Sequence, residues 1–393
     1  MKPIVFSLVL LILIVPVSAL VWLWPRYDYL PAKPLPFYVE RVSAEPIIHG
    51  GLSDRLGEVA GGEEGYVNIN GPALIAVPDW LPDPLGKYYL YFAHHKGDHI
   101  RMAYADRIEG PWTVHEPGTL SLADSGFPTT PVTGEATDNA LKNLWDNYSI
   151  YIVRDMLLLA YRSAVTDQAT RKERGITNAA NSLPHIASPE VVVDEKNHRL
   201  LMYYHGLAGK TAQYTRMAQS PDGLSFTALP AIIHSNYLRA FQHRGSWYGL
   251  TMPGILYRSD TGVEDFEPRD KRLFEPDMRH AGLWLQDDTL YVFWSRVGDA
   301  PEGILVSEVD LSASDWNDWR STQPQVLLRP ELAWEGGNLK VQSSLRGELG
   351  LPANELRDPF VFEVDAQPYL LYTGAGEQAI GLAKLRSTTR PEE

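Results

Sequence analysis

The chain has 393 residues, of which 44% are hydrophobic and 11% aromatic, so it can bury a sizeable core and is far from a disordered composition. Its formal net charge of −14 argues against nucleic acid as a partner, because no basic stripe is present to contact phosphates. It contains no cysteine, which excludes disulfides, thiolate metal sites and cysteine nucleophiles.

Residues 4–24 form an uncharged, apolar-rich run that is long enough to cross a bilayer as a helix. Trp22 and Trp24 stand where an interfacial aromatic belt would lie, which favours an uncleaved membrane anchor. Pro16, followed by the small residues 17–19, also resembles the end of a cleavable signal peptide, and this alternative stays open. Either way, we expect the rest of the chain to reach the periplasmic or extracellular side of a bacterial cell envelope.

By composition, the chain divides into four segments. Residues 1–24 are assigned to the anchor or signal, and the proline-rich residues 25–36 to a stiff extended spacer that holds the globular part off the lipid. Residues 37–387 are expected to form the folded unit, with an insertion at 127–182, and residues 388–393 a disordered tail.

One pattern recurs five times beyond the spacer: a short apolar strand, a tight polar turn and a strand rich in Tyr, Leu and Phe. The β-branched and aromatic content of each copy is typical of a β-hairpin. The copies start near Pro72, Pro189, Ala240, Ala281 and Pro359. A third strand, such as HIRMAYAD, and a more polar fourth, such as WTVHEP, complete a four-stranded blade. We therefore predict an all-β fold, a five-bladed β-propeller.

Two segments do not belong to the repeat. FYVERVSAEPIIHG at residues 37–50 has no hairpin partner, and we expect it to close the ring as the outer strand of the last blade, since an open ring leaves strand edges exposed. Within the insertion, residues 136–148 predict a helix and residues 149–163 a hairpin. The hairpin could instead be a sixth blade, but no recognisable fourth strand follows it, which favours an insertion folded over one rim.

Polar residues recur at the same places in all five repeats, which packing alone does not require. Innermost strands of a propeller converge on one axis, so their entry ends and the turns after their partner strands face a common funnel. The entry ends carry Asn70, His185, Glu190, Arg239, His243, Arg279, His280, Arg357 and Asp358. The partner strands and turns add His94, His95, His205, Trp294 and Glu377. The sequence therefore predicts a ligand site on the axis.

The blade sequences NGPALIAVPDW, HIASPEVVVD and LRDPFVFEVDAQPYLLYTGAGEQAIGLAKL resemble five-bladed glycosidases of the arabinanase and xylosidase type, glycoside hydrolase family 43 and its relatives. They are most similar to an uncharacterised bacterial branch of that superfamily. The resemblance covers residues 66–126 and 183–386 and leaves out 127–182. It implies a glycan-active protein, a glycoside hydrolase whose ligand is an oligosaccharide or polysaccharide fragment.

The resemblance also implies three carboxylates, and two of them are replaced here. Where the family opens blade one with an Asp-Pro that holds the general base, this chain reads Asn70-Gly71-Pro72, and an amide cannot take a proton from water. Glu190 matches the acidic residue that tunes the pKa of the acid. Blade three offers Arg239, Gln242 and His243 in place of the glutamate that serves as general acid.

Glycoside hydrolysis needs one group that donates a proton and one that accepts it, and histidine can serve as the acid because its pKa lies near neutrality. We therefore predict Asp358 or Glu190 as the base and His205 or His280 as the acid. Asp358 could instead cap its strand and pair with Arg279. The other funnel residues are expected to bind the substrate. The alternative function is a carbohydrate-binding propeller without catalysis.

Arg239, Arg279 and Arg357 are predicted to occupy equivalent blade positions, and guanidinium groups bind carboxylates and sulfates in bidentate fashion. An acidic sugar is therefore one hypothesis, and neutralisation of central carboxylates is its rival. No cofactor is predicted. The funnel histidines permit a supporting Ca²⁺ or other ion, although their spacing is not that of a specific metal site.

Overall fold

The computed structural model describes residues 27, 29–57, 67–131, 148–149, 152–153, 155–157, 183–209 and 212–388. The predicted anchor or signal, the predicted helix up to residue 147, and residues 389–393 of the predicted tail lie outside this part. Among the described residues, no helix is long and apolar enough to span a bilayer.

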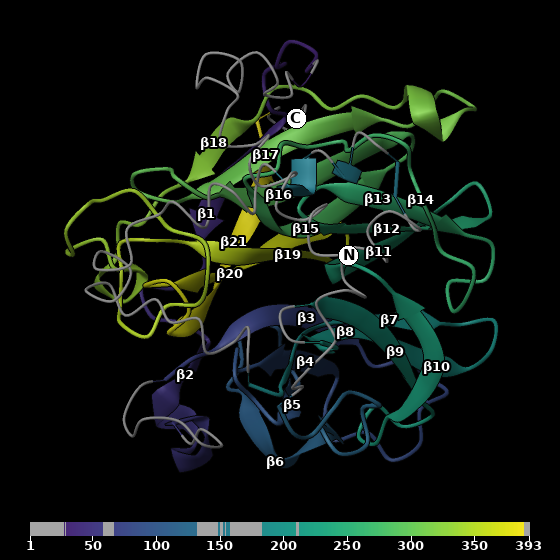
Figure 1. Cartoon of the computed structure of the whole chain (residues 1–393). Coiled ribbons are helices and arrows are strands. Elements are labelled where there is room, and N and C mark those ends of the chain that lie inside the picture. The colour runs from purple at the N-terminus through teal and green to yellow at the C-terminus, as the bar shows by residue number, and fades with distance from the viewer. Residues whose placement is uncertain are drawn as a thin grey trace, which may run out of the picture.

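Five antiparallel sheets form a ring, with the innermost strands around its centre and the outermost strands at its rim (Figure 1). Blade one contains β3 (Asn70–Ala76), β4 (Tyr88–Ala93), β5 (His99–Ala105) and β6 (Thr113–Ser121). Blade two contains β7 (Ile186–Asp194), β8 (Arg199–Leu207), β9 (Gln213–Ser220) and β10 (Thr227–Ile233). Blade three contains β11 (Asn236–His243), β12 (Ser246–Met252), β13 (Ile255–Ser259) and β14 (Glu267–Pro268).

Blade four contains β15 (Met278–Gln286), β16 (Thr289–Arg296), β17 (Ile304–Asp310) and β18 (Gln325–Leu328). Blade five contains β19 (Arg357–Val364), β20 (Gln367–Gly374), β21 (Ala379–Ser387), β1 (Phe37–Arg41) and the short β2 (Ile48–His49). Short 3₁₀ helices lie at Gly50–Leu52, Asp54–Gly57, Trp316–Asp318 and Ala333–Glu335. The predicted five-bladed β-propeller is confirmed.

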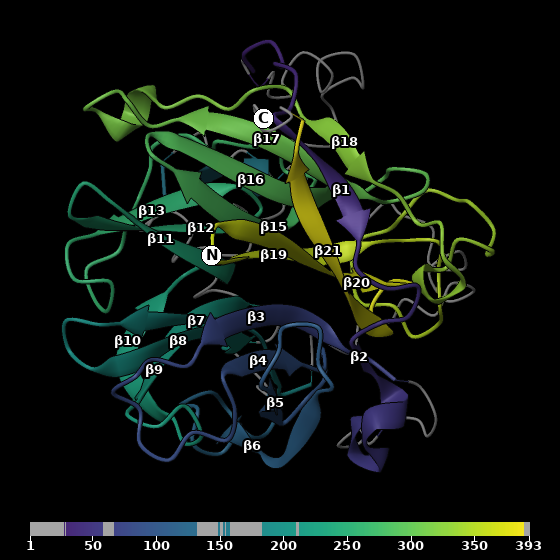
Figure 2. The same ribbon diagram turned by 180° about the vertical axis from the view of Figure 1, so that it is seen from behind.

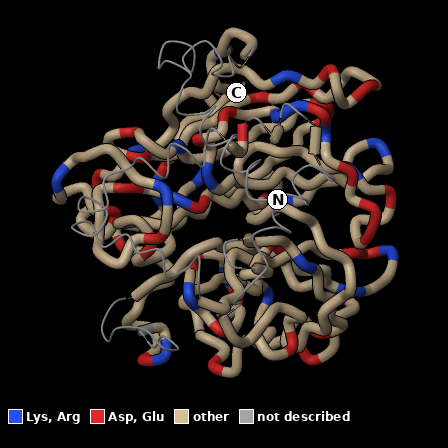
Figure 3. Tube along the Cα trace, viewed as in Figure 1, with Lys and Arg blue, Asp and Glu red and all other residues tan. Residues whose placement is uncertain are grey.

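Apolar side chains of neighbouring blades interlock and hold the ring together. Tyr203 of β8 packs in one buried cluster with Leu238 of β11, and Val306 of β17 packs in another with Leu370 of β20. Charged residues of both signs are scattered among the blades rather than gathered into a basic stripe (Figure 3). The core therefore consists of the inter-blade layers, and the axis is left to polar residues.

The ring closes between the two ends of the described chain, as predicted. β1 pairs antiparallel with β21 from Phe37 opposite Ser387 to Arg41 opposite Ala383, and Figure 2 shows the purple β1 beside the yellow β21. The Arg41 guanidinium then reaches the loop after β18, where its Nε lies 2.7 Å from Oε1 of the fully buried Glu335. Pairing of the two strands thus removes the exposed edge that an open ring would leave.

Arg41→Ala is expected to lower the free energy of unfolding by about 2 kcal/mol, because it leaves the Glu335 carboxylate buried without its cation. The measurement is urea unfolding monitored by tryptophan fluorescence. Arg386→Ala is the matched control, since Arg386 of β21 pairs with Glu40 of β1 at the surface and is expected to cost less than about 1 kcal/mol. Equal losses in the two variants would contradict this account of the closure.

The inserted segment differs from its prediction. Residues 152–153 and 155–157 are helical, not the hairpin expected at 149–163. Val153 N donates to Ser149 O over 3.0 Å, which is a helical turn, and Ile152 is fully buried in the cluster between blades two and three. The apolar residues that local propensity assigned to strands are therefore explained, in this part of the segment, by burial of a helix against the propeller. Together with the five sheets, this favours an insertion over the alternative of a sixth blade.

Residues 29–36 do not stand off the propeller as the spacer prediction expects. Leu30 N donates to Ser321 O over 3.0 Å, and Leu30 O accepts from Gln323 N over 2.8 Å. The Tyr29 hydroxyl accepts a hydrogen bond from Glu275 N. This proline-rich segment therefore packs along blade four and its neighbour.

Candidate functional site

A β-bulge interrupts every innermost strand close to its first residue. In β3 the pairing skips from Asn70 to Ala73, and the same shift occurs in β7, β11, β15 and β19. Four of the bulges hold a residue with positive φ, namely Gly71 (59°), Ser188 (47°), Tyr237 (56°) and Asp358 (48°). Bulges re-aim side chains, and all five lie at one end of the axis, here called the entry end.

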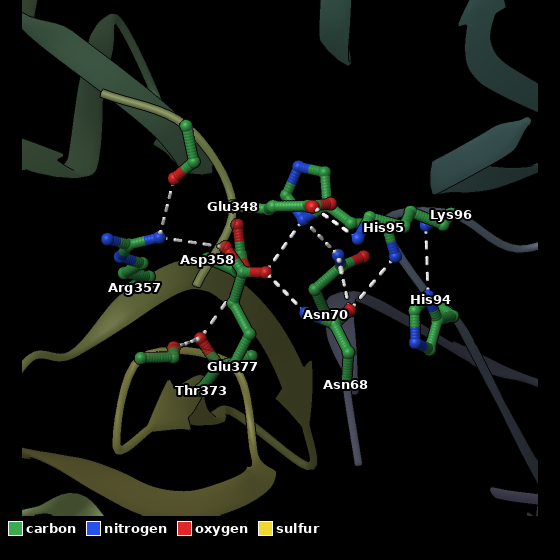
Figure 4. A network of polar contacts seen from close by, with 12 residues as sticks. Asn68, Asn70, His94, His95, Lys96, Glu348, Arg357, Asp358, Thr373 and Glu377 are labelled. Atoms are coloured by element: carbon green, nitrogen blue, oxygen red, sulfur yellow. Dashed lines mark hydrogen bonds and ion pairs between the residues drawn. The ribbon is translucent and has the colours of Figure 1, made fainter. Parts of the chain in front are cut away.

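Asn68, Asn70, His95, Ser188, His205, Tyr237, His280, Arg357, Asp358 and Glu377 make up the axial cluster at the entry end, and all of them are buried. Figure 4 shows Glu377 at its centre, between His95 on one side and Arg357 on the other. Its Oε2 lies 2.7 Å from His95 Nδ1 and accepts from Asn68 Nδ2, and its Oε1 accepts from Arg357 Nη1 over 3.0 Å.

Burial alone would raise the pKa of Glu377. The facing His95 and the Arg357 guanidinium outweigh burial and hold the pKa of this carboxyl well below its usual range. Glu377 is therefore ionised at neutral pH.

A second carboxylate–imidazole pair lies beside the first. Asp358 Oδ1 contacts His280 Nδ1, and Asp358 Oδ2 accepts from Thr373 Oγ1 over 3.3 Å. Burial and the nearby Arg279 hold the pKa of His280 well below its usual range. The pair therefore places a carboxyl group against an imidazole that is neutral at physiological pH and that can become protonated when charge develops on a ligand.

Tyr237 links the two pairs, although sequence reasoning did not single it out. Its hydroxyl contacts His95 Nε2. Its ring lies between two imidazoles, with centroids 4.0 Å from His205 and 4.1 Å from His280. The axial cluster is thus a stack of three rings with acid–base groups on both sides.

Several buried polar atoms of the axial cluster find no hydrogen-bond partner within the described chain. They are both ring nitrogens of His205, Ser188 Oγ and Asn70 Oδ1, with His185 Nε2 close by. Buried polar groups are normally paired, and leaving one unpaired costs about 1–3 kcal/mol. Such a concentration of unpaired donors and acceptors indicates a site that a polar ligand completes.

The three predicted arginines do not occupy equivalent positions, and this expectation is wrong. Arg357 pairs across from Thr373 before its bulge, Arg279 lies within a bulge, and Arg239 follows one. The sequence hides the difference because β11 starts at Asn236, ahead of the start near Ala240 that its repeat pattern suggests.

Each of these guanidinium groups is paired with an internal carboxylate. Arg357 Nε donates to Glu355 Oε2 over 3.0 Å, and Arg279 Nε lies 3.3 Å from Glu302 Oε1. Arg239 Nη1 donates to Glu190 Oε2 over 2.7 Å. The observed pairing is the one expected from neutralisation of central carboxylates.

Glu190 and Arg239 lie just beyond the bulges and tie the inner strands to one another. The second oxygen of Glu190 accepts from Ala240 N over 3.2 Å. Burial raises the pKa of Glu190, and Arg239 opposes that shift. Both oxygens of Glu190 are therefore engaged within the protein.

Of the remaining predicted residues, His94 and His185 lie next to the axial cluster. His94 Nδ1 accepts from Lys96 N over 2.9 Å, and burial together with Arg101 lowers the pKa of His94 to about 3. His185 precedes β7, and burial lowers its pKa to about 4. Both histidines are therefore neutral at physiological pH.

Two predicted funnel residues lie elsewhere, and their assignment to the funnel is wrong. His243 is the last residue of β11, roughly 23 Å along the strand from Asn236, and its Nε2 lies 3.3 Å from Asp288 Oδ1. Trp294 is fully buried in a hydrophobic cluster, where its indole N–H donates to Ser307 Oγ over 3.2 Å. The error at His243 follows from the bounds of β11, which ends at this residue. The error at Trp294 follows from the face of β16 on which its side chain lies.

Sequence reasoning missed Asn68, Ser188, Tyr237, Glu302, Glu348, Glu355 and Thr373. Ser188 and Tyr237 share the bulge position of Asp358, so an alignment of the bulges would have found them. Glu348 and Glu355 come from the connection between β18 and β19, which carries no repeat signal. Within the described residues, no group of three or more His, Asp and Glu side chains is arranged to hold a metal ion.

No family model matches the chain. A candidate glycoside hydrolase from Bacteroides ovatus has the same fold, with 10% identity, 92% of this chain and 99% of that chain covered, and a TM-score of 0.54. A second from Parabacteroides distasonis gives 11% identity, coverages of 94% and 99%, and a TM-score of 0.51. The resemblance to five-bladed glycosidases is thereby confirmed for the fold.

An exo-β-1,3-galactanase from Phanerochaete chrysosporium, solved with β-1,3-galactotriose, gives a TM-score of 0.45 at 10% identity over 83% of this chain, which spans 61% of that protein's length. Among curated proteins, the chain is 32% identical over 344 residues to the "Uncharacterized protein R118" of Acanthamoeba polyphaga mimivirus, covering 81% of this chain and 84% of that one. With this identity over most of both sequences, the chain belongs to the same family as that mimivirus protein, and its fold is a five-bladed propeller of the kind found in glycoside hydrolases.

Proposed function

We propose that the protein is a glycoside hydrolase that binds an oligosaccharide at the entry end of its axis. The observation that carries this proposal is the axial cluster, where two carboxylate–imidazole pairs meet a set of unpaired buried polar atoms. Sugar hydroxyls both donate and accept hydrogen bonds, so they can satisfy atoms such as the two ring nitrogens of His205.

The Asp358–His280 pair serves as the acid in this proposal. Hydrolysis breaks the bond between the anomeric carbon and the glycosidic oxygen while a water oxygen bonds to that carbon. His280 is neutral in the free protein, and in this proposal it becomes protonated when the substrate binds. The leaving oxygen then receives a proton from His280 Nε2, since Nδ1 faces Asp358 Oδ1, and a base at the entry end takes a proton from the water. Asp358 stabilises the imidazolium from which the proton departs.

Asp358→Asn is expected to lower kcat by at least about 100-fold, since it removes the charge that supports a proton donor. Hydrolysis is followed with 4-nitrophenyl α-L-arabinofuranoside, β-D-xyloside, β-D-galactoside and β-D-glucuronide. The control is Asp288→Asn, the same change at a half-exposed carboxylate beside His243, where activity is expected to be unchanged. Absence of turnover on all four probes and on the corresponding oligosaccharides would overturn the hydrolase proposal.

Binding without cleavage is the second candidate. Two observations favour it: Glu190 is saturated by Arg239 and Ala240, and Asn70 stands near the place of the family's base. Calorimetric titration with oligosaccharides separates the two candidates, because a binding protein shows affinity for a sugar that it does not hydrolyse.

The charge of the substrate and the location of the protein are parts of the proposal that need their own tests. Because Arg239, Arg279 and Arg357 each pair with an internal carboxylate, we propose a neutral rather than an acidic sugar, which faster turnover of the galactoside than of the glucuronide would support. We propose export across a membrane from residues 4–24 alone, and fractionation of cells expressing the full-length chain tests it.

A further inference from the structure

The position where the family resemblance implies a base has no room for a carboxylate. Gly71 has φ of 59°, and a Cβ at this residue would lie 2.6 Å from the backbone of Ser188. The preceding Asn70 is an amide, and its Nδ2 lies 2.7 Å from His95 Nδ1. If the protein hydrolyses glycosides, another group must therefore accept the proton of the attacking water.

His95 lies beside Asn70, and an imidazole is a side chain that can accept a proton. Glu377 is ionised, and an ionised carboxylate only accepts hydrogen bonds, so the proton in the 2.7 Å contact between Glu377 and His95 belongs to Nδ1 of the imidazole. The contact of Asn70 Nδ2 with the same nitrogen is then not a hydrogen bond, and Asn70 Nδ2 donates to Asn68 Oδ1 over 3.2 Å instead. The other ring nitrogen of His95, Nε2, is the one that is left to accept a proton. That nitrogen contacts the hydroxyl of Tyr237.

Tyr237 is held in an unusual way. It has φ of 56°, in a region that costs a bulky residue about 1–3 kcal/mol and that recurs at functional sites. His205 and His280 sandwich its ring, and Ser188 faces its hydroxyl. The surrounding structure therefore holds the phenol oxygen against His95 and Ser188.

We propose that Tyr237 is a catalytic residue and that its hydroxyl delivers the water proton to His95. As the water oxygen bonds to the anomeric carbon and the glycosidic bond breaks, one water proton passes to the Tyr237 oxygen, and the phenol proton passes to His95 Nε2. Glu377 stabilises the resulting imidazolium, so His95 and Glu377 act through Tyr237. This inference rests on the proposed hydrolase function.

The relay avoids a free phenolate. Burial and the charge of Glu377 raise the pKa of Tyr237 above its ordinary value, so a separate tyrosinate would be costly in this site. A hydroxyl that gives up one proton while gaining another stays neutral throughout. The charge that develops is that of the His95 imidazolium, which lies against a carboxylate.

The test compares Tyr237→Phe with the wild-type chain on two aryl versions of whichever glycoside the wild type hydrolyses, 4-nitrophenyl and 2,4-dinitrophenyl. A group that activates water is needed whatever the leaving group, so we expect kcat to fall at least about 100-fold on both. The azide ion attacks without losing a proton. We therefore expect sodium azide to raise the rate of Tyr237→Phe at least about tenfold and to yield a glycosyl azide, which mass spectrometry identifies.

The matched control is Tyr203→Phe, which removes a buried hydroxyl that donates to Gly262 O between blades two and three, and we expect its kcat to match wild type. Circular dichroism and thermal unfolding check the fold of each variant. If Tyr237→Phe does not fold, His95→Gln, which removes the proton acceptor, goes through the same comparisons with the same expected results.

Three results would overturn the inference while leaving the hydrolase intact: a folded Tyr237→Phe within about threefold of wild type, no rescue by azide, or a loss that disappears with the better leaving group. The last would identify an acid instead of a base. If the wild type hydrolyses no glycoside at all, the proposed function fails and the relay fails with it.

Discussion

Arg239→Leu is expected to lower the free energy of unfolding by about 4 kcal/mol, the largest effect of any single substitution considered. Arg239 Nε donates to Ala281 O over 2.8 Å, and its terminal nitrogens donate to Pro189 O over 2.9 Å and Pro72 O over 3.1 Å. Its guanidinium also lies 5.3 Å from the centre of the Phe360 ring. One side chain of blade three thus contacts the innermost strands of the other four blades.

The loss arises mainly because Glu190 would be left in a buried place without its counter-ion. Glu190→Leu alone is expected to cost about 3 kcal/mol, and the double variant clearly less than the sum of the single losses, because it leaves no unpaired charge. Urea unfolding of the four proteins gives this coupling. Losses that simply add would show that the bonds to carbonyl groups, and not the ion pair, dominate.

Arg244→Leu is the matched control for this cycle. Arg244 pairs with Asp288 at the surface over 2.8 Å, and both side chains are about half exposed. Its removal is expected to change the free energy of unfolding by less than about 1 kcal/mol. A loss comparable to that of Arg239→Leu would mean that burial is not the source of the effect.

The free energy of unfolding is expected to fall steeply as the pH is lowered from 7 to 5. His94, His185, His205 and His280 all have pKa values below the ordinary value near 6.5, with burial as the first cause. The unfolded chain then binds more protons than the native chain, so stability rises with pH in this window. For His185, with a pKa of about 4, the loss at pH 5 is about 2 kcal/mol relative to pH 8.

Glu377 acts in the same direction at lower pH. Its native pKa is depressed, so the stability it contributes is present above its unfolded pKa and is lost as the pH falls through its native value. Urea unfolding at pH 5, 6, 7 and 8 measures the sum of these contributions. Unfolding free energies that are equal at pH 5 and pH 7 would contradict the neutral, buried state of the histidines.

His185→Asn isolates one of these groups. The asparagine amide can replace the donor that His185 Nδ1 directs at Leu183 O, but it cannot take up a proton. The slope of the unfolding free energy against pH is set by the number of protons taken up on unfolding. Between pH 5 and 6, we expect this number to be smaller by close to one in the variant. His198→Asn, at an exposed position, is expected to leave it unchanged.

The sequence determined the fold because the information for each blade is local. A hairpin such as β15 and β16 is written in one continuous stretch, with alternating side chains and a two-residue polar turn at Asp287 and Asp288. β1 was predictable by elimination, since a strand at Phe37–Arg41 without a neighbour must find the free edge of the last blade. The family resemblance rests on these same blades.

The tertiary structure alone decided which polar residues meet. His95, Tyr237 and Glu377 come from three different blades, and no local pattern links them. The bulges shift each inner strand by one residue, and such a shift changes the face on which a side chain lies. Charge pairing could not be read from the sequence either. Arg239 pairs with Glu190 and not with a ligand because the closed ring brings the two side chains within 2.7 Å of each other. Composition and repeats therefore determined the ring, whereas the contents of its axis follow only from the register at which the five strands converge.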